Sequence, residues 1–169
     1  HDQEWGVPVY SEQKLFEFLV LEGLQAGLNW LTILKKREAF KKDLDNFQPE
    51  KIAHYSAKKL NLLLSNRNRN KMHAVVKNAQ AYLEIQSKHG NFADYIWSFV
   101  DGKPQQNNWK THEQVPAQTH LSSTMAKELK LQGFNFVGPT ICYAFMQAVG
   151  MVNDHTTDCF RHKQIYNIN

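Results

Sequence analysis

One carboxylate stands in an otherwise apolar stretch near the start of the chain. Glu22 lies in LVLEGLQAGLNW, where both neighbouring helical turns are apolar and Gly23 and Gly27 follow the glutamate. A carboxylate in such surroundings loses much of its hydration unless it meets a donor or a cation. The pattern allows an exposed glutamate on the polar side of a helix, or a pocket carboxylate near Trp30 and Trp5. A pocket of that kind would favour a flat, electron-poor or cationic ligand, through charge and through stacking on the indoles.

Two metal-binding residue types stand four positions apart near the end of the chain. His155 and Cys159 have the spacing that places two side chains on one face of a helix. Imidazole and thiolate are both zinc ligands, but a structural zinc takes about four ligands. His1 could supply a third, and His162 could compete for the site. The alternative is a capped helix end with a buried thiol, and the pattern alone leaves both open.

A glycine-rich turn, Gly133 to Gly138, separates two stretches of helical pattern. Pro139 suits the first turn of the helix that follows, and free N–H groups at a helix N-terminus form a ready anion site. Backbone amides can position a phosphate while nearby cations neutralise it. Cations flank the turn in sequence on both sides: Lys127, Lys130, Arg161 and Lys163. The alternative is a helix–turn–helix corner that only packs.

Helical periodicity accounts for most of the chain. Helices are predicted over residues 11–26, 30–40, 60–64, 68–85, 92–100, 123–132 and 139–149, with a short element from residue 49. Ser11, and Ser122 or Ser123, are the expected N-caps, and Gly150 is an expected C-cap. No alternating strand pattern is present, and residues 103–121 have the composition of a polar loop. The expected fold class is all-α, in one domain over residues 1–169.

Composition and net charge exclude few classes of protein. The 169 residues, 42% hydrophobic and 21% charged, suffice for one well-packed domain. No apolar run reaches about 18 residues, so no membrane segment is expected, and no secretory leader is visible. Two cysteines, Cys142 and Cys159, suit a reducing compartment and favour the cytoplasm. The net charge of +4 is compatible with nucleic-acid binding without requiring it.

Taken in order, these pieces resemble the bacterial 3-methyladenine DNA glycosylase I family of the helix-hairpin-helix DNA glycosylase superfamily. The segments that carry the resemblance are HDQEWGVPV, LFEFLVLEGLQAGLNWLTILKKRE, RNRNKMHAVVKNAQAYL, FADYIWSFV and GFNFVGPTICYAFMQAVGMVNDH. The resemblance implies a helix-hairpin-helix domain with its hairpin at about residues 123–150. It also implies a bacterial, cytoplasmic, monomeric enzyme that excises 3-methyladenine from double-stranded DNA containing alkylated purines and so initiates base excision repair.

The resemblance also assigns roles to residues. Glu22, in the EGxQAGLxW motif, is implied to hydrogen-bond the alkylated adenine and is the expected catalytic residue. Trp30 is implied to stack on the base, with Trp5 beside the same pocket. The residues implied to contact DNA are Gly27, Leu28, Lys130, Gly133, Gly138 and Thr140.

The resemblance further implies a structural Zn²⁺ held by His1, His155 and Cys159. This metal would join residues 155–159 to the start of the chain in a zinc-tethered region. The family's fourth ligand is a cysteine from a segment before HDxEWG, and neither it nor that segment's pocket aromatics have a counterpart in the sequence. The few apolar residues that the family carries before RNR are also missing, because Ser65-Asn66 runs directly into Arg67. Both gaps are interpreted as missing residues rather than evolved deletions.

Two features of the segment after the hairpin bear on the mechanism of excision. Most relatives in the superfamily carry an aspartate after the hairpin, but that position is Asn153 here. Asp154 is interpreted as orienting the metal-ligand histidine or capping a helix. Strand-cleaving relatives use a lysine amine near the hairpin, and no lysine lies between Lys130 and Lys163. A monofunctional enzyme, which releases the base without cutting the strand, is therefore predicted. Two other classes remain open: a non-catalytic DNA-binding module that keeps only the hairpin, and a structural zinc-binding helical protein.

Overall fold

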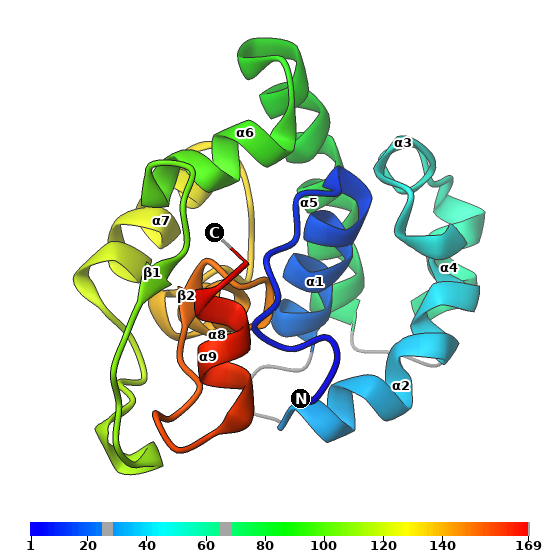
Figure 1. Cartoon of the computed structure of the whole chain (residues 1–169). Helices are drawn as coiled ribbons and strands as arrows, with labels where there is room; N and C mark the ends of the chain where they lie inside the picture. The colour runs from blue at the N-terminus through cyan, green and yellow to red at the C-terminus, as the bar shows by residue number, and fades with distance from the viewer. Residues whose placement is uncertain (25–28, 65–68, 169) are drawn as a thin grey trace.

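A computed structural model describes residues 1–24, 29–64 and 69–168, and its regular structure is almost entirely helical (Figure 1). The α-helices are α1 (Glu12–Leu24), α2 (Trp30–Asp43), α3 (Pro49–Ile52), α4 (Ala57–Leu64), α5 (Arg69–His89), α6 (Phe92–Trp97), α7 (His120–Leu131), α8 (Pro139–Ala148) and α9 (Phe160–Tyr166). Short 3-10 turns are η1 (Asp45–Phe47), η2 (Ser98–Val100) and η3 (His112–Gln114), and the strands are β1 (Gln105–Gln106) and β2 (Val152–Asn153). The all-α prediction is confirmed.

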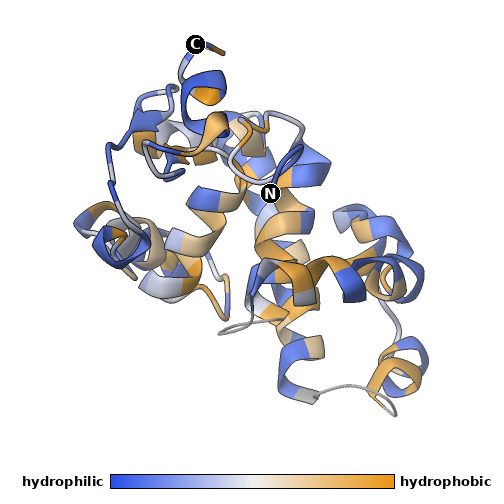
Figure 2. Ribbon diagram, turned by 60° about the horizontal axis from the view of Figure 1, so that its bottom comes forward, coloured by the Kyte–Doolittle hydropathy of each residue, from blue (hydrophilic) through white to orange (hydrophobic). Residues whose placement is uncertain are grey.

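Helix α1 is the centre of the molecule. Its last ten residues, 15–24, are all buried, and α2, α5, α6 and α8 pack around it. A helix that is buried on every side is typical of a domain core. Figure 2 shows apolar residues on the sides of the helices that face the interior. This placement carries two carboxylates, Glu17 and Glu22, into the core with the helix.

The N-terminal loop is fixed against the C-terminal end of α8. Gly150 ends that helix with φ +73, and a Cβ on it would lie 2.5 Å from the backbone nitrogen of Pro8. The N–H of Gly6 donates to the carbonyl of Ala148 at 3.2 Å, and that of Val9 donates to Val149 at 3.0 Å. Only a glycine allows this approach, because any side chain would push the loop away. The docking determines where Trp5 lies.

The structure differs from the predicted elements in three places. Helix α7 begins at His120, and Thr119 is its N-cap through a capping box with Ser122, so the predicted serine caps are wrong. Strand β1 lies within the predicted loop 103–121 and pairs in parallel with β2, and neither these strands nor α9 were predicted. Residues 25–26, predicted to end the first helix, lie outside the described residues. None of the described helices has the length and hydrophobicity needed to span a membrane.

Candidate active site

The turn between α7 and α8 is a tight hairpin that leaves amides unpaired at the start of α8. Gly133 has φ +98 and ends α7, where its own N–H donates to Lys130 and the N–H of Phe134 donates to Leu129, both at 3.0 Å. This pattern is a Schellman motif. Gly138 is the N-cap of α8 and makes no side-chain capping bond, while Pro139 takes the first helical position. The first turn of α8 can therefore offer backbone N–H groups to an anion.

The structure brings four of the predicted DNA-contacting residues together on this hairpin. Lys130 is exposed in the last turn of α7, Gly133 and Gly138 bound the turn, and Thr140 is exposed in the first turn of α8. The other two, Gly27 and Leu28, lie outside the described residues. Two of the cations that flank the turn in sequence are not part of this group, because α9, which carries Arg161 and Lys163, packs on β2 beyond the other end of α8.

Asn78 of α5 holds the hairpin in place. Its side-chain amide donates to the carbonyl of Asn135 at 3.0 Å, and its side-chain oxygen accepts from the N–H of Asn135 at 2.7 Å. A Cβ on Gly23 of α1 would lie 3.2 Å from the carbonyl oxygen of Phe136. The hairpin therefore contacts α1 immediately beside Glu22. Sequence reasoning missed Asn78, because its partner lies 57 residues away.

We expect Asn78→Ala to weaken binding of duplex DNA about tenfold, because the turn loses both hydrogen bonds that fix its backbone. The same change should lower the free energy of unfolding by about 1–3 kcal/mol. Fluorescence anisotropy with a labelled duplex and denaturant unfolding measure the two effects. The control is Asn61→Ala on α4, where the asparagine is exposed. Equal DNA affinity of the two variants would contradict the role given to Asn78.

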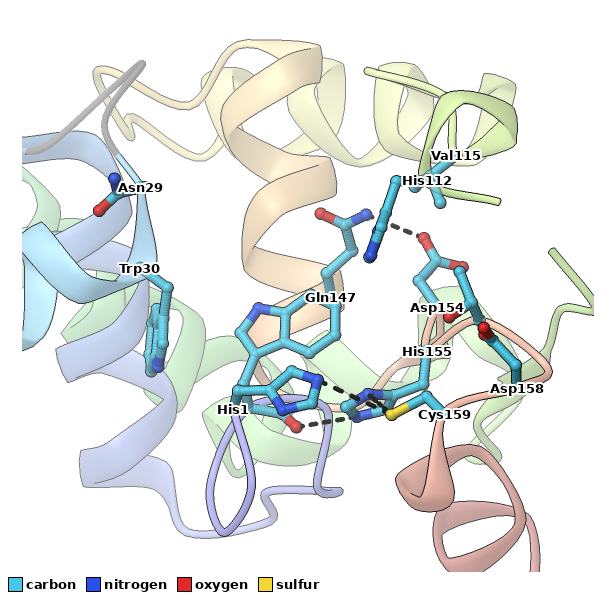
Figure 3. A pocket seen from close by; sticks show the side chains of 12 residues that line it. His1, Asn29, Trp30, His112, Val115, Gln147, Asp154, His155, Asp158 and Cys159 are labelled. Atoms are coloured by element: carbon cyan, nitrogen blue, oxygen red, sulfur yellow. Dashed lines mark hydrogen bonds between the residues drawn. The ribbon is translucent and has the colours of Figure 1, made fainter. Parts of the chain in front are cut away.

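A cavity of about 820 Å³ opens between the N-terminal loop, the start of α2, the end of α8 and the segment after β2 (Figure 3). Trp30 stands on one wall, and Trp5 lines the cavity as well. Trp30 is the first residue of α2, which Asn29 caps by accepting from the N–H of Thr32 at 2.9 Å. The remaining lining residues are His1, Asn29, His112, Val115, Gln147, Asp154, His155, Thr156, Asp158 and Cys159.

Glu22 is 7% exposed, so the surface alternative for this residue is wrong. Burial raises the pKa of its carboxyl to about 7, and no side chain among the described residues donates a hydrogen bond to it. Phe18, one helical turn earlier, stacks on Trp30 with ring centroids 5.5 Å apart. Glu22 is not among the residues that line the cavity. Glu22 thus lies one helical turn from the ring that stacks on Trp30, while Trp5 and Trp30 line the same cavity.

The three predicted zinc ligands meet at one edge of the cavity. His1, His155 and Cys159 each present a ligand atom within 4.8 Å of the others. The Cys159 Sγ lies 3.8 Å from His1 Nε2 and 3.7 Å from His155 Nδ1. Tetrahedral zinc with ordinary Zn–N and Zn–S bonds would place such atoms about 3.6 Å apart. The second ring nitrogens are occupied, since His155 Nε2 lies 3.2 Å from the carbonyl of Trp5 and His1 Nδ1 lies 2.6 Å from Asp2. The donor set fits the metal.

Asp154 has neither of the two roles predicted for it, because four other side chains occupy its carboxylate. Oδ1 accepts from Asn107 at 2.7 Å and from the Trp109 indole at 2.8 Å. Oδ2 accepts from Tyr143 at 2.5 Å and from Gln147 at 2.9 Å. Burial, followed by the bond to Asp154, raises the pKa of Tyr143 and keeps its hydroxyl a donor. The carboxylate joins the loop after β1 to α8, and the N-cap position of α9 is held by Cys159, which makes no side-chain capping bond.

The chain matches the methyladenine glycosylase family over residues 1–162. It is 48% identical to the DNA-3-methyladenine glycosylase of Haemophilus influenzae, over 94% of this chain and 88% of that protein. A crystal structure of 3-methyladenine DNA glycosylase I is similar, with a TM-score of 0.91 and 48% identity over 95% of this chain and 90% of that one. A tyrosine-to-phenylalanine variant of such an enzyme, solved in complex with 3-methyladenine, has a TM-score of 0.91 and 37% identity over 95% and 88%. The chain therefore belongs to the methyladenine glycosylase family.

Proposed function

We propose that the protein is a monofunctional DNA glycosylase that turns 3-methyladenine out of double-stranded DNA and removes it by hydrolysis. The observation that carries the proposal is Glu22, a buried carboxylate without a cationic partner among the described residues, one turn beyond the phenylalanine that stacks on Trp30. An uncompensated carboxylate next to aromatic rings suits a flat cation. Membership of the family, and the relative that binds 3-methyladenine, support the choice of base.

Departure of the methylated base needs little help from the protein. Methylation at N3 gives the base a positive charge, so it leaves as a neutral molecule when the bond between N9 and C1′ breaks. The bond's electron pair departs with the base, and the sugar becomes an oxocarbenium ion. Water then adds to C1′ and releases a proton, leaving an abasic site. Ionised Glu22 would accept a hydrogen bond from the base and stabilise the positive charge as it moves to the sugar.

Exposure of the base is the larger task. Turning a nucleotide out of the stack costs a few kcal/mol, and a damaged base lowers that cost. The hairpin amides near Gly138 and Thr140, with Lys130, would hold the phosphate backbone while Trp30 and Trp5 receive the base. The charge of the N3-methylated ring distinguishes it from neutral adenine at these walls. We infer that the protein acts as a monomer.

One observation favours base release without strand cleavage, and a second bears on which carboxylate is catalytic. No lysine lies between Lys130 and Lys163, so the segment after the hairpin supplies no amine to form a Schiff base with the sugar. Asp154, the carboxylate nearest to the superfamily's aspartate position, is occupied by four donors. Glu22 is therefore the carboxylate to which we assign the catalytic role.

The test is release of methylated purines from alkylated duplex DNA, identified by chromatography, with strand breaks counted before and after alkali. We expect 3-methyladenine in solution and breaks that form only after alkali, because the product is an intact abasic strand. Breaks before alkali would contradict the monofunctional mechanism. DNA binding without release would indicate a non-catalytic binding module, and the absence of salt-dependent DNA binding would indicate a structural protein.

We further propose that His1, His155 and Cys159 hold a structural Zn²⁺. The metal would supply no chemistry to the reaction, but would tie the N-terminal loop to the segment between β2 and α9. The metal would also fix the position of Trp5, because the Trp5 ring packs edge-on against His155 with centroids 4.9 Å apart. Gly6 allows this contact, since a Cβ there would lie 2.8 Å from His155 Nε2. No other described His, Cys, Asp or Glu joins the three as a fourth ligand.

A further inference from the structure

Arg37 differs from the cations beside it in sequence. Lys35 and Lys36 are exposed on α2, whereas the Arg37 side chain is only 13% exposed. Its guanidinium lies against α1 and the N-terminal loop, and Figure 1 shows these three segments converging at the N-terminus. Burying a guanidinium is costly unless its donors are paired, so its position calls for partners.

Partners come from both neighbouring segments. The Nε of Arg37 donates to Glu17 Oε1 at 2.6 Å, and Nη1 donates to both carboxylate oxygens of Glu4, at 2.7 and 2.9 Å. The guanidinium also lies over the ring of Phe18, 5.3 Å from its centroid. A planar group with several fixed donors can satisfy two carboxylates and a ring face at once, which a lysine ammonium cannot.

Each of these three segments carries one residue of the proposed base site. Glu4 immediately precedes Trp5 in the N-terminal loop. Phe18 lies one turn before Glu22 on α1, and the same ring stacks on Trp30 of α2, with centroids 5.5 Å apart. Arg37 therefore joins the backbones that carry Trp5, Glu22 and Trp30, although it lines none of the cavity wall described above.

Arg37 also gives the two buried carboxylates of α1 different electrostatic surroundings. The Glu17 side chain is 7% exposed and has Arg37 at 2.6 Å and Lys41 at 3.9 Å. Glu22, five residues along the same helix, has no ion pair among the described residues. Arg37 thus neutralises Glu17, through which it holds α1 in place, and leaves the negative charge of Glu22 available for a cationic base.

We infer that Arg37 is a positioning residue, which fixes the N-terminal loop, α1 and α2 relative to one another so that Trp5, Glu22 and Trp30 face one ligand. The inference rests on the proposed function for its effect on catalysis. The tether itself does not depend on that function, and it can be measured without substrate. Loss of the tether should free the loop at Glu4 and misplace Trp5 relative to Trp30.

The test compares R37Q, R37K and the double variant E17Q/R37Q with E17Q and with the matched control K36Q on the same helix. E17Q/R37Q is included because R37Q leaves the buried Glu17 with only the more distant Lys41, at 3.9 Å, as an ion-pair partner and could unfold. Two quantities are measured: amide hydrogen exchange of residues 1–10 by mass spectrometry, and the single-turnover rate of 3-methyladenine release.

We expect the loop to exchange about tenfold faster, and the base to be released about tenfold more slowly, in E17Q/R37Q than in E17Q. K36Q should match the wild type. R37K should restore neither quantity, whereas a role that needs only positive charge would be rescued by lysine. Unchanged loop exchange in E17Q/R37Q, or full rescue by R37K, would overturn the inference. If the wild type released no base, the proposed function would be wrong, but the exchange data would still show whether Arg37 tethers the N-terminal loop.

Discussion

Glu22→Gln should slow single-turnover release of 3-methyladenine by about a hundredfold or more, while binding of undamaged duplex DNA stays unchanged. The glutamine is nearly isosteric and keeps an acceptor oxygen, so the variant removes the negative charge and little else. Binding of the DNA backbone is assigned to the hairpin, which contacts α1 at Gly23. The measurement is the rate of base release with enzyme in excess over methylated duplex.

The matched control is Glu38→Gln, because the side chain of Glu38 is 83% exposed and pairs with Lys41 on the same helix. That variant should release the base at the wild-type rate. If Glu22→Gln did so too, the assignment of the catalytic charge to Glu22 would be wrong. Equal loss of DNA binding and of excision would instead point to a folding defect.

The same substitution should stabilise the protein at alkaline pH. Burial raises the pKa of Glu22 from 4.5 to about 7, so the folded state prefers the protonated carboxyl. That preference is fully present below pH 4.5 and is lost as the pH rises through about 7, where the buried group must ionise. The corresponding free energy is about 3 kcal/mol. Relative to the wild type, Glu22→Gln should therefore gain up to about 3 kcal/mol above pH 7 and nothing below pH 4.5, measured by urea unfolding across pH.

The activity of the wild type should increase with pH, whereas the contribution of Glu22 to its stability decreases. The proposed reaction uses ionised Glu22, so the rate should rise as the pH increases through about 7. A cationic base in the pocket favours the carboxylate, so the midpoint in the enzyme–DNA complex should lie below that of the free enzyme. The wild type thus retains at neutral pH a charge that destabilises its fold and that the reaction needs.

The parts of this site that were predictable have local causes. Glu22 was a pocket candidate because apolar residues surround it within two helical turns, and it lies in the central helix, α1. The hairpin follows from Gly133, Gly138 and Pro139, whose conformational preferences act within a few residues. The His155–Cys159 pair was suggested by its four-residue spacing, but the helix that this spacing assumed is wrong, because both residues lie in the non-helical segment before α9. Each of these signals is contained in a short window of sequence.

The parts that escaped prediction depend on contacts between distant segments. Arg37 meets Glu4 across 33 residues, and Asp154 receives donors from 45 and 47 residues away. Strand β1 meets β2 across a similar separation. Side-chain hydrogen bonds of this kind leave no periodic pattern, because only the packed fold brings the two ends together. Glu17 was the one available signal, since it is a second carboxylate within the same apolar helix and needed a cation.

Loss of a zinc ligand should have the largest effect on stability. His155→Ala should reduce bound zinc from about one per chain to none and lower the melting temperature by about 10 °C, since one kcal/mol shifts the midpoint by about 2–4 °C in a domain of this size. The ring of His155 also contacts Trp5, so loss of metal and ring together should loosen the N-terminal loop. Metal content by mass spectrometry and thermal unfolding with and without a chelator measure the two effects.

The control for this variant is His120→Ala, because His120 is an exposed histidine at the start of α7. It should keep both its zinc and its melting temperature. Cys159→Ala should reproduce the metal loss of His155→Ala while leaving the Trp5 contact in place, which separates the contribution of the metal from that of the ring. Wild-type protein that contains no zinc, and whose melting temperature is insensitive to a chelator, would rule out the metal. The arrangement of His1, His155 and Cys159 would then be a purely hydrogen-bonded contact between the N-terminal loop and the chain beyond β2.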